Sequence, residues 1–157
     1  MIRTAIPEEA EAVAGVQVRS WQAAYAHIFP PERLAGLSVE ERATMWRRYP
    51  PLVAEVDGEI VGFASVGPSQ DPDGDGELYA IYVEPRYWGA GFGRELMAAA
   101  EQRLRELGHR EAFLWVFEDN PRAHRFYEAA GWELEGATQP IEYLGQSEPE
   151  VRYRKVL

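Results

Sequence analysis

The feature that most constrains the fold of this chain is a strand, a glycine-rich turn and a helix start in direct succession. The stretch Glu77-Leu-Tyr-Ala-Ile-Tyr-Val-Glu-Pro-Arg-Tyr-Trp-Gly-Ala-Gly-Phe-Gly-Arg94 is apolar and aromatic up to Pro85 and then places glycine at 89, 91 and 93. A helix N-terminus carries unpaired N–H groups and about half a positive charge, and glycine lets the backbone approach an anion closely. The stretch therefore predicts a binding turn for a phosphate-bearing cofactor.

Two common phosphate-binding patterns fit this turn poorly. The P-loop requires Gly-Lys-Ser/Thr, a tripeptide that the chain lacks. The dinucleotide pattern Gly-x-Gly-x-x-Gly has Arg94 where its third glycine belongs. Glu118 and Asp119 do follow the next expected strand, where a dinucleotide site has its acidic residue, so a dinucleotide site is weakened but stays an alternative.

A third pattern, Arg/Gln-x-x-Gly-x-Gly/Ala, is matched position by position by Arg86-Tyr87-Trp88-Gly89-Ala90-Gly91. Followed by Gly93 and an amphipathic helix, it resembles the coenzyme A pyrophosphate loop of the GNAT N-acetyltransferase superfamily. The segment Asn120-Pro-Arg-Ala-His-Arg-Phe-Tyr-Glu-Ala-Ala-Gly-Trp132 is similar to that superfamily's Asn-x-x-Ala-x-x-Phe-Tyr-x-x-x-Gly-Phe, with Trp for the final Phe. The resemblance runs from Val53 to Trp132, about half of the chain. The segment Ser20–Tyr25 also looks like the first helix of one branch of the superfamily.

The resemblance implies transfer of an acetyl group from acetyl-CoA to an amine by direct attack. Two parallel strands, Leu78–Val83 and Glu111–Phe117, are expected to splay apart, with the pantetheine arm pairing to the first of them. Backbone N–H groups from Tyr87 to Arg94 would meet the pyrophosphate, and the Arg94 guanidinium would add charge. The implied cofactor-binding residues are Ile81, Tyr82, Val83, Arg86, Tyr87, Trp88, Gly89, Ala90, Gly91, Phe92, Gly93, Arg94, Asn120 and Tyr127.

The same resemblance suggests the catalytic groups. Tyr127 aligns with the family's tyrosine that faces the coenzyme sulfur, and a phenol can donate a proton to the leaving thiolate. Asn120 would cap the helix that it begins and touch the pantetheine arm. Glu77 is the leading candidate for the base, acting through water, because it enters the splayed strand. His27 is an alternative base; His109 and His124 are poorer candidates, since we expect His124 on an exposed helix face.

The acceptor cannot be read from the sequence. Trp21, Tyr25, Tyr79 and Trp115 are candidate walls of its pocket, because aromatic rings hold alkyl stems and cations. The acceptor can be a small molecule or a protein amino group, and another acyl-CoA or an oxygen nucleophile would suit the same fold. A noncatalytic coenzyme A sensor is the alternative from a different class, although such a sensor would not need the acid at Tyr127.

Composition narrows the partners. The chain has 157 residues, a net charge of −10 and no cysteine, which excludes disulfides and a cysteine nucleophile and disfavours nucleic acid. The acidic excess suits a cationic substrate, or serves only solubility. No apolar run approaches the ~18 residues of a membrane span and no secretory signal is evident, so we expect no membrane partner and a cytoplasmic location. No metal site is expected, because the acidic turn 71–76 has Tyr82 where a calcium loop needs glutamate.

The expected architecture is a single α/β domain over 1–157. Its sheet is mixed and mostly antiparallel, with one splayed parallel pair and helices on both faces, and the resemblance allows a homodimer through the C-terminal strands. Asp57-Gly58 predicts a hairpin, and Gly108 ends a helix whose apolar face is Leu96, Ala100, Leu104 and Leu107. The last two strands, 132–138 and 150–157, are expected to flank a loop with Pro140, Gly145 and Pro149.

Overall fold

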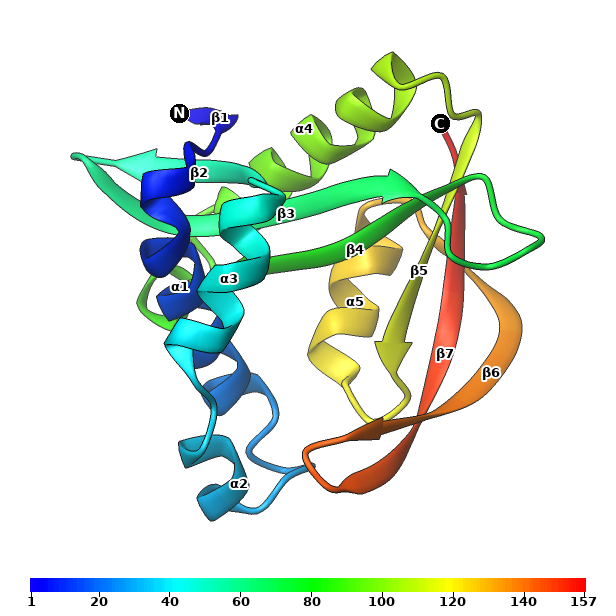
Figure 1. Cartoon of the computed structure of the whole chain (residues 1–157). Helices are drawn as coiled ribbons and strands as arrows, with labels where there is room; N and C mark the ends of the chain where they lie inside the picture. Colours follow the sequence, from blue (N-terminus) through cyan, green and yellow to red (C-terminus); the bar gives the residue numbers. More distant parts are fainter. The chain divides into compact units, whose positions relative to one another are not determined.

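A computed structural model describes residues 1–157 (Figure 1). Seven strands form one sheet in the order β1-β2-β3-β4-β5-β7-β6. The β4–β5 pair is parallel, while β1–β2, β2–β3, β5–β7 and β6–β7 are antiparallel. The predicted fold class, a mixed and mostly antiparallel sheet with one parallel pair, is thereby confirmed. The elements are β1 (Ile2–Thr4), η1 (Pro7–Glu9), α1 (Ala10–Ala24), α2 (Pro31–Ala35), α3 (Val39–Arg48), β2 (Leu52–Val56), β3 (Glu59–Pro68), β4 (Gly76–Val83), η2 (Pro85–Tyr87), α4 (Phe92–Glu106), β5 (Glu111–Phe117), α5 (Pro121–Ala129), β6 (Glu133–Tyr143) and β7 (Gln146–Val156).

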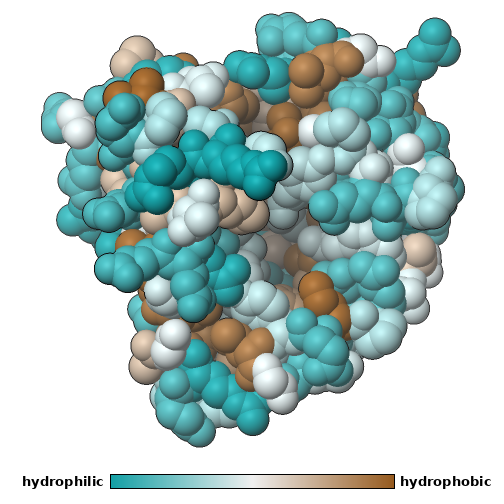
Figure 2. Space-filling view, viewed as in Figure 1, coloured by the Kyte–Doolittle hydropathy of each residue, from teal (hydrophilic) through white to brown (hydrophobic).

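The chain divides into two compact units. The first, here the N-unit, comprises Met1–Ser65 and Ala80–Gln102, and the second, the C-unit, comprises Val66–Tyr79 and Arg103–Leu157. The single-domain organisation over 1–157 stays a prediction. Hydrophilic side chains cover most of the face seen in Figure 2, in keeping with the net charge of −10. No helix is long and apolar enough to cross a membrane.

The core of the N-unit lies where α1 and α3 pack together. Val13 and Val16, one helical turn apart on α1, belong to one cluster of buried residues with Trp46 of α3 and Phe63 of β3. The hairpin between β2 and β3 turns at Asp57-Gly58, with φ of 50° and 80°. Both values are left-handed, as a two-residue hairpin turn requires, so this prediction from sequence is confirmed.

The C-unit contains the longest hairpin, in which β6 and β7 join at Leu144-Gly145. The loop expected across 138–150 was therefore wrong, because paired strand occupies most of it. Pro140 and Pro149 lie opposite each other in the register, so their missing N–H groups fall on a single rung. The strand β6 also ends the strand order, where proline is best tolerated.

The helix α4 follows the glycine-rich turn. Leu96, Ala100 and Leu104 are buried as predicted, but Leu107 lies beyond the helix end and is 54% exposed, so its assignment to the apolar face was wrong. The helix stops at Glu106 because Gly108 has a φ of +91° and turns the chain in the left-handed region.

Candidate active site

The predicted phosphate turn lies in the N-unit between η2 and α4. Gly89 and Gly91 have φ of +83° and +96°, a region that L side chains rarely adopt. A Cβ at Gly89 would meet nothing within 4 Å, whereas one at Gly91 would lie 3.6 Å from Nη2 of Arg94. The first N–H groups of α4 have no acceptor inside the helix. The turn thus combines two glycines without side chains, the N-terminus of α4 and the Arg94 guanidinium. This combination fits a diphosphate.

The end of β4 precedes this turn and carries the residues predicted to pair with the pantetheine arm. The N–H of Glu84 donates to Val61 of β3 at 2.8 Å. Because neighbouring residues of a strand point their N–H and C=O groups to opposite edges, the carbonyl of Val83 faces away from β3. The indole Nε1 of Trp88 donates to that carbonyl at 2.8 Å.

Two ion pairs border the turn. The guanidinium of Arg19 on α1 donates to both carboxylate oxygens of Glu84, at 2.7 and 2.8 Å, and this Arg19–Glu84 pairing raises the pKa of the guanidinium. Arg86, predicted as a cofactor contact, forms an exposed ion pair with Glu59 and lies over the ring of Tyr87.

Two of the predicted pocket walls, Trp21 and Tyr25, lie in the N-unit against Tyr82. The ring centres of Trp21 and Tyr25 are 5.2 Å apart, those of Trp21 and Tyr82 are 5.9 Å apart, and the hydroxyl oxygens of Tyr25 and Tyr82 are 3.1 Å apart. Tyr25 is buried. His27, the alternative base, is exposed in the turn that follows α1.

Glu77, the predicted base, lies near the start of β4 in the C-unit and is 7% exposed. Its Oε1 accepts hydrogen bonds from the N–H of Gln70 at 3.1 Å and from the hydroxyl of Ser69 at 3.3 Å. Burial raises the pKa of the Glu77 carboxyl, the Gln70 bond opposes this, and the nearby charges of Asp71 and Glu150 raise the pKa further. A buried carboxyl with a raised pKa is a better proton acceptor near neutral pH than an exposed one.

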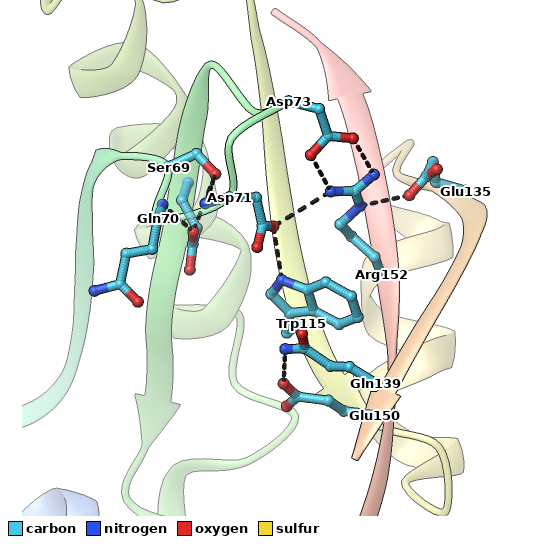
Figure 3. A network of polar contacts seen from close by, with 10 residues as sticks. Ser69, Gln70, Asp71, Asp73, Trp115, Glu135, Gln139, Glu150 and Arg152 are labelled. Carbon is cyan, nitrogen blue, oxygen red and sulfur yellow. Dashed lines mark hydrogen bonds and ion pairs between the residues drawn. The ribbon is translucent and has the colours of Figure 1, made fainter. Parts of the chain in front are cut away.

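The guanidinium of Arg152 on β7 binds carboxylates from the loop between β3 and β4, residues 69–75 (Figure 3). It donates to Asp73 at 3.0 and 2.9 Å, to Asp71 at 3.3 Å and to Glu135 of β6. Arg152 itself is 5% exposed. The acidic turn that resembled a calcium loop therefore directs two of its carboxylates to a buried arginine.

Two more groups complete the network in Figure 3. Trp115 donates from Nε1 to Asp71 at 2.9 Å, and the buried Glu150 of β7 accepts from Gln139 at 2.6 Å. Burial raises the pKa of Glu150 as it does for Glu77, and the charge of Asp71 adds to the effect. The Arg152 guanidinium therefore binds three carboxylates, those of Asp71, Asp73 and Glu135. It binds neither Glu77 nor Glu150, whose hydrogen bonds come from neutral groups.

The other predicted catalytic residue, Tyr127, lies on α5 in the C-unit. Asn120 caps this helix, since its Oδ1 accepts from the N–H of Ala123 at 3.3 Å and Pro121 takes the first helical position. The ring of Tyr127 is 5.9 Å from that of the buried Tyr153 on β7.

Tyr153 also fixes α5. Its hydroxyl donates to Glu128 at 3.0 Å and lies 2.7 Å from Nδ1 of His124. Burial first, and then Glu128, raise the pKa of Tyr153 to about 12. His124 was expected on an exposed face, but it is partly buried because its second nitrogen also meets the Glu118 carbonyl, at 2.9 Å.

Tyr79, the remaining predicted wall besides Trp115, is 41% exposed, and its hydroxyl donates to the Pro68 carbonyl. His109 lies between α4 and β5, and its Nδ1 is 2.7 Å from Oδ1 of Asp75. The structure thus groups Glu77, Tyr79, Trp115, Asn120 and Tyr127 in the C-unit, and the turn residues with Trp21 and Tyr25 in the N-unit.

Comparison with known proteins decides the family. The model of the acetyltransferase (GNAT) family matches residues 16–132. The chain belongs to the GNAT acetyltransferase family. The predictions of an N-acetyltransferase, and of acetyl-CoA as its cofactor, are thereby confirmed.

Individual relatives agree with GNAT membership. An uncharacterized N-acetyltransferase, YuaI, of Bacillus subtilis is 37% identical over 134 residues, which cover 82% of this chain and 77% of YuaI. Spermine/spermidine N(1)-acetyltransferase of Bacillus subtilis is 33% identical over 94 residues, 56% of this chain and 62% of that protein. The PaiA N-acetyltransferase of Thermoplasma acidophilum, solved with coenzyme A, has the same fold, with a TM-score of 0.76 at 21% identity over 100% of this chain and 98% of that one.

The GNAT motifs did not indicate Glu150, Arg152 or the Arg19–Glu84 pair. Arg152 and Asp71 are 81 positions apart, and Arg19 and Glu84 are 65 apart. No local pattern indicates which cation meets which carboxylate over such separations. The one available signal was the run of aspartates in the acidic turn 71–76, because clustered carboxylates need a cationic partner.

Proposed function

We propose that this protein acetylates a small amine that carries more than one positive charge. The observation that carries the proposal is the pair of buried carboxyls, Glu77 and Glu150, which the Arg152 guanidinium does not neutralise. Buried carboxyls favour a cationic ligand, because burial makes an unpaired negative charge costly. The similarity to a spermine/spermidine acetyltransferase supports the same class of acceptor. A protein amino group is the second candidate.

For the donor, we assign the diphosphate of acetyl-CoA to the N–H groups from Tyr87 to Arg94. The positive φ at Gly89 and Gly91, the N-terminus of α4 and the nearby Arg94 support this assignment. The pantetheine arm is assigned to the edge of β4 at Ile81, Tyr82 and Val83. Asn120 and Arg86 complete the proposed donor contacts.

Acetyl-CoA supplies the activated acetyl group as a thioester. In the proposed reaction, Glu77 takes a proton from the acceptor's ammonium through water, since a free alkylammonium has a pKa near ~10.4. The amine then forms a bond to the acetyl carbon while the carbon–sulfur bond breaks. Tyr127 would give its phenolic proton to the leaving thiolate, and the second proton that the nitrogen loses as the amide forms would restore the phenol. Trp21, Tyr25, Tyr79 and Trp115 are proposed to line the path of the acceptor.

An acetylation panel tests the proposed acceptor. Release of free thiol from acetyl-CoA is followed with spermidine, putrescine, lysine, an aminoglycoside and a peptide with a free N-terminus. We expect the highest kcat/KM with a polyamine and a lower value for a monoamine of equal length, which is added to the panel as the matched control. A peptide that outperforms every polyamine would overturn the small-molecule assignment, and binding of acetyl-CoA without turnover on any acceptor would favour a noncatalytic sensor. NAD serves as the control ligand in thermal-shift measurements.

Three further expectations stay predictions. The homodimer through the C-terminal strands, the cytoplasmic location and the single domain over 1–157 each follow from the sequence resemblance or composition. Sedimentation analysis of the purified protein would test the first of them directly.

A further inference from the structure

Glu84, the residue that joins β4 to the glycine turn, has all of its polar groups engaged. Its N–H donates to Val61 at 2.8 Å, its carbonyl accepts from Tyr87 at 2.8 Å, and both carboxylate oxygens accept from Arg19. Glu84 is also 7% exposed. Burial makes an unpaired negative charge costly, and Arg19 is the cation that pairs with the Glu84 carboxylate, so the position of Glu84 depends on Arg19.

Arg19 reaches Glu84 from a helix that is anchored in the core. This helix is α1, which Val13 and Val16 anchor. A Cβ at Gly15 would lie 3.0 Å from Nη1 of Arg19, so the bare backbone at Gly15 makes room for the guanidinium. The two parallel hydrogen bonds of the fork fix direction as well as distance, which a lysine could not do.

The turn begins immediately after this junction. The Tyr87 N–H bonds back to Glu84, and the Trp88 indole bonds back to Val83, before the chain reaches Gly89 and Gly91. Two contacts therefore fix the start of the turn: the bond from Trp88 to Val83 of β4, and the bond from Tyr87 to Glu84, which Arg19 of α1 holds in place. We propose that Arg19 is a positioning residue for donor binding, because it holds Glu84 and thereby orients the N–H groups that receive the diphosphate.

This proposal rests on the donor assignment in the proposed function. Its physical basis is preorganisation: a loop that the ligand must first order binds that ligand more weakly. Arg19 touches no reacting atom in this scheme. Its loss should therefore weaken donor binding and leave the chemical step unchanged at saturation.

The test compares Arg19→Met with a matched control, Arg3→Met. Arg3 makes the same kind of fork, to Glu9 at 2.8 and 2.7 Å, and also bonds Glu55, but it lies on β1. For each variant, calorimetry gives the Kd for coenzyme A, and kinetics give kcat and KM for acetyl-CoA. S-acetylpantetheine, a donor without the diphosphate, is the second probe.

We expect Arg19→Met to raise the Kd and the KM by about tenfold, with kcat within about twofold of the wild type. Its kcat/KM with S-acetylpantetheine should equal that of the wild type, and Arg3→Met should change none of these values. Equal Kd values for Arg19→Met and the wild type, or a lower kcat at unchanged KM, would overturn the proposal.

Two further variants keep the test decisive if Arg19→Met does not fold. Arg19→Lys retains the charge without the fork and should give an intermediate Kd, and the exchange Arg19→Glu with Glu84→Arg should restore part of the affinity. A Kd for Arg19→Lys equal to the wild type would contradict the role of the fork. If the wild-type protein itself fails to bind coenzyme A, the donor assignment fails first, which separates the two proposals.

Discussion

The indole N–H of Trp88 donates a 2.8 Å hydrogen bond to the carbonyl of Val83, five positions earlier in the chain. This bond closes the glycine turn onto the edge of β4 that faces away from β3. A Cβ at Gly62 of β3 would lie 3.1 Å from the Tyr82 carbonyl, which places that neighbouring carbonyl on the opposite edge. The turn and the strand end therefore form one connected surface within the N-unit.

Trp88→Phe keeps an aromatic ring and removes the N–H donor together with the second ring of the indole. Because one hydrogen bond contributes about 1 kcal/mol, we expect coenzyme A to bind about fivefold more weakly. Calorimetry measures the change. Tighter binding by Trp88→Phe would show instead that the indole competes with the donor for the Val83 carbonyl.

Glu77→Gln tests the base. Burial raises the pKa of Glu77, so the ionised, proton-accepting form grows as pH rises through that raised pKa, and kcat/KM should rise with it. In Glu77→Gln, we expect this limb of the pH profile to disappear and kcat to fall by about tenfold or more. A variant with the wild-type pH profile would contradict the assignment.

Tyr127→Phe tests the acid. We expect an unchanged Kd for acetyl-CoA and a kcat lower by about tenfold or more, because the thiolate then leaves without a proton donor. Tyr49→Phe, a change at a tyrosine that is 59% exposed, is the control and should have wild-type kinetics. Unchanged turnover in Tyr127→Phe would remove the acid role.

Glu150→Gln should stabilise the protein at neutral pH. Burial raises the folded-state pKa of Glu150, so its favourable contribution is complete below the unfolded pKa and is lost as pH rises through the folded pKa. The neutral amide avoids that loss. We expect a higher Tm for the variant at pH 7.5 and no difference at pH 4, measured by circular dichroism. The exposed Glu133→Gln should change neither value, and a lower Tm of Glu150→Gln at pH 7.5 would contradict the prediction.

Gly76→Ala should destabilise the C-unit through crowding. A Cβ there would lie 2.9 Å from Cδ2 of Leu104 and 3.0 Å from Cγ of His109, and such overpacking costs about 1–3 kcal/mol. Gly36→Ala is the matched control, because its nearest neighbour would be 3.4 Å away and its φ is −81°. Urea unfolding measures both variants, and equal midpoints would refute the crowding argument.

Local chemistry made much of the fold predictable. Asp57-Gly58 indicated the hairpin, Asn120-Pro121 indicated the start of α5, and Gly108 indicated the end of α4, because each of these residues determines the backbone of its own neighbourhood. The β6–β7 hairpin was missed for the opposite reason. Pro140 and Pro149 suggest a loop when each is read alone, and only their pairing across the two strands makes them compatible with a sheet.

The site divides in the same way. The glycine turn could be singled out from the sequence because its pattern lies in consecutive residues; its cofactor contacts stay a prediction. Glu150 and Arg152 could not be singled out, because their partners come from the loop between β3 and β4 and from β6, and only the folded sheet brings them together. Residues whose partners are distant in the sequence form no motif that a fixed spacing could identify.

Because side chains alternate along β7, an error in the register of this strand would affect contacts on both of its faces. Arg152 binds the acidic loop, while Tyr153 and Lys155 hold α5 through Glu128 and the Ala130 carbonyl. A slip of this strand by one residue against β5 would exchange its two faces and break both sets of contacts together. A chain with a misaligned β7 would therefore lose its contacts to the loop and to α5 at once, so that both faces of the strand select the same register.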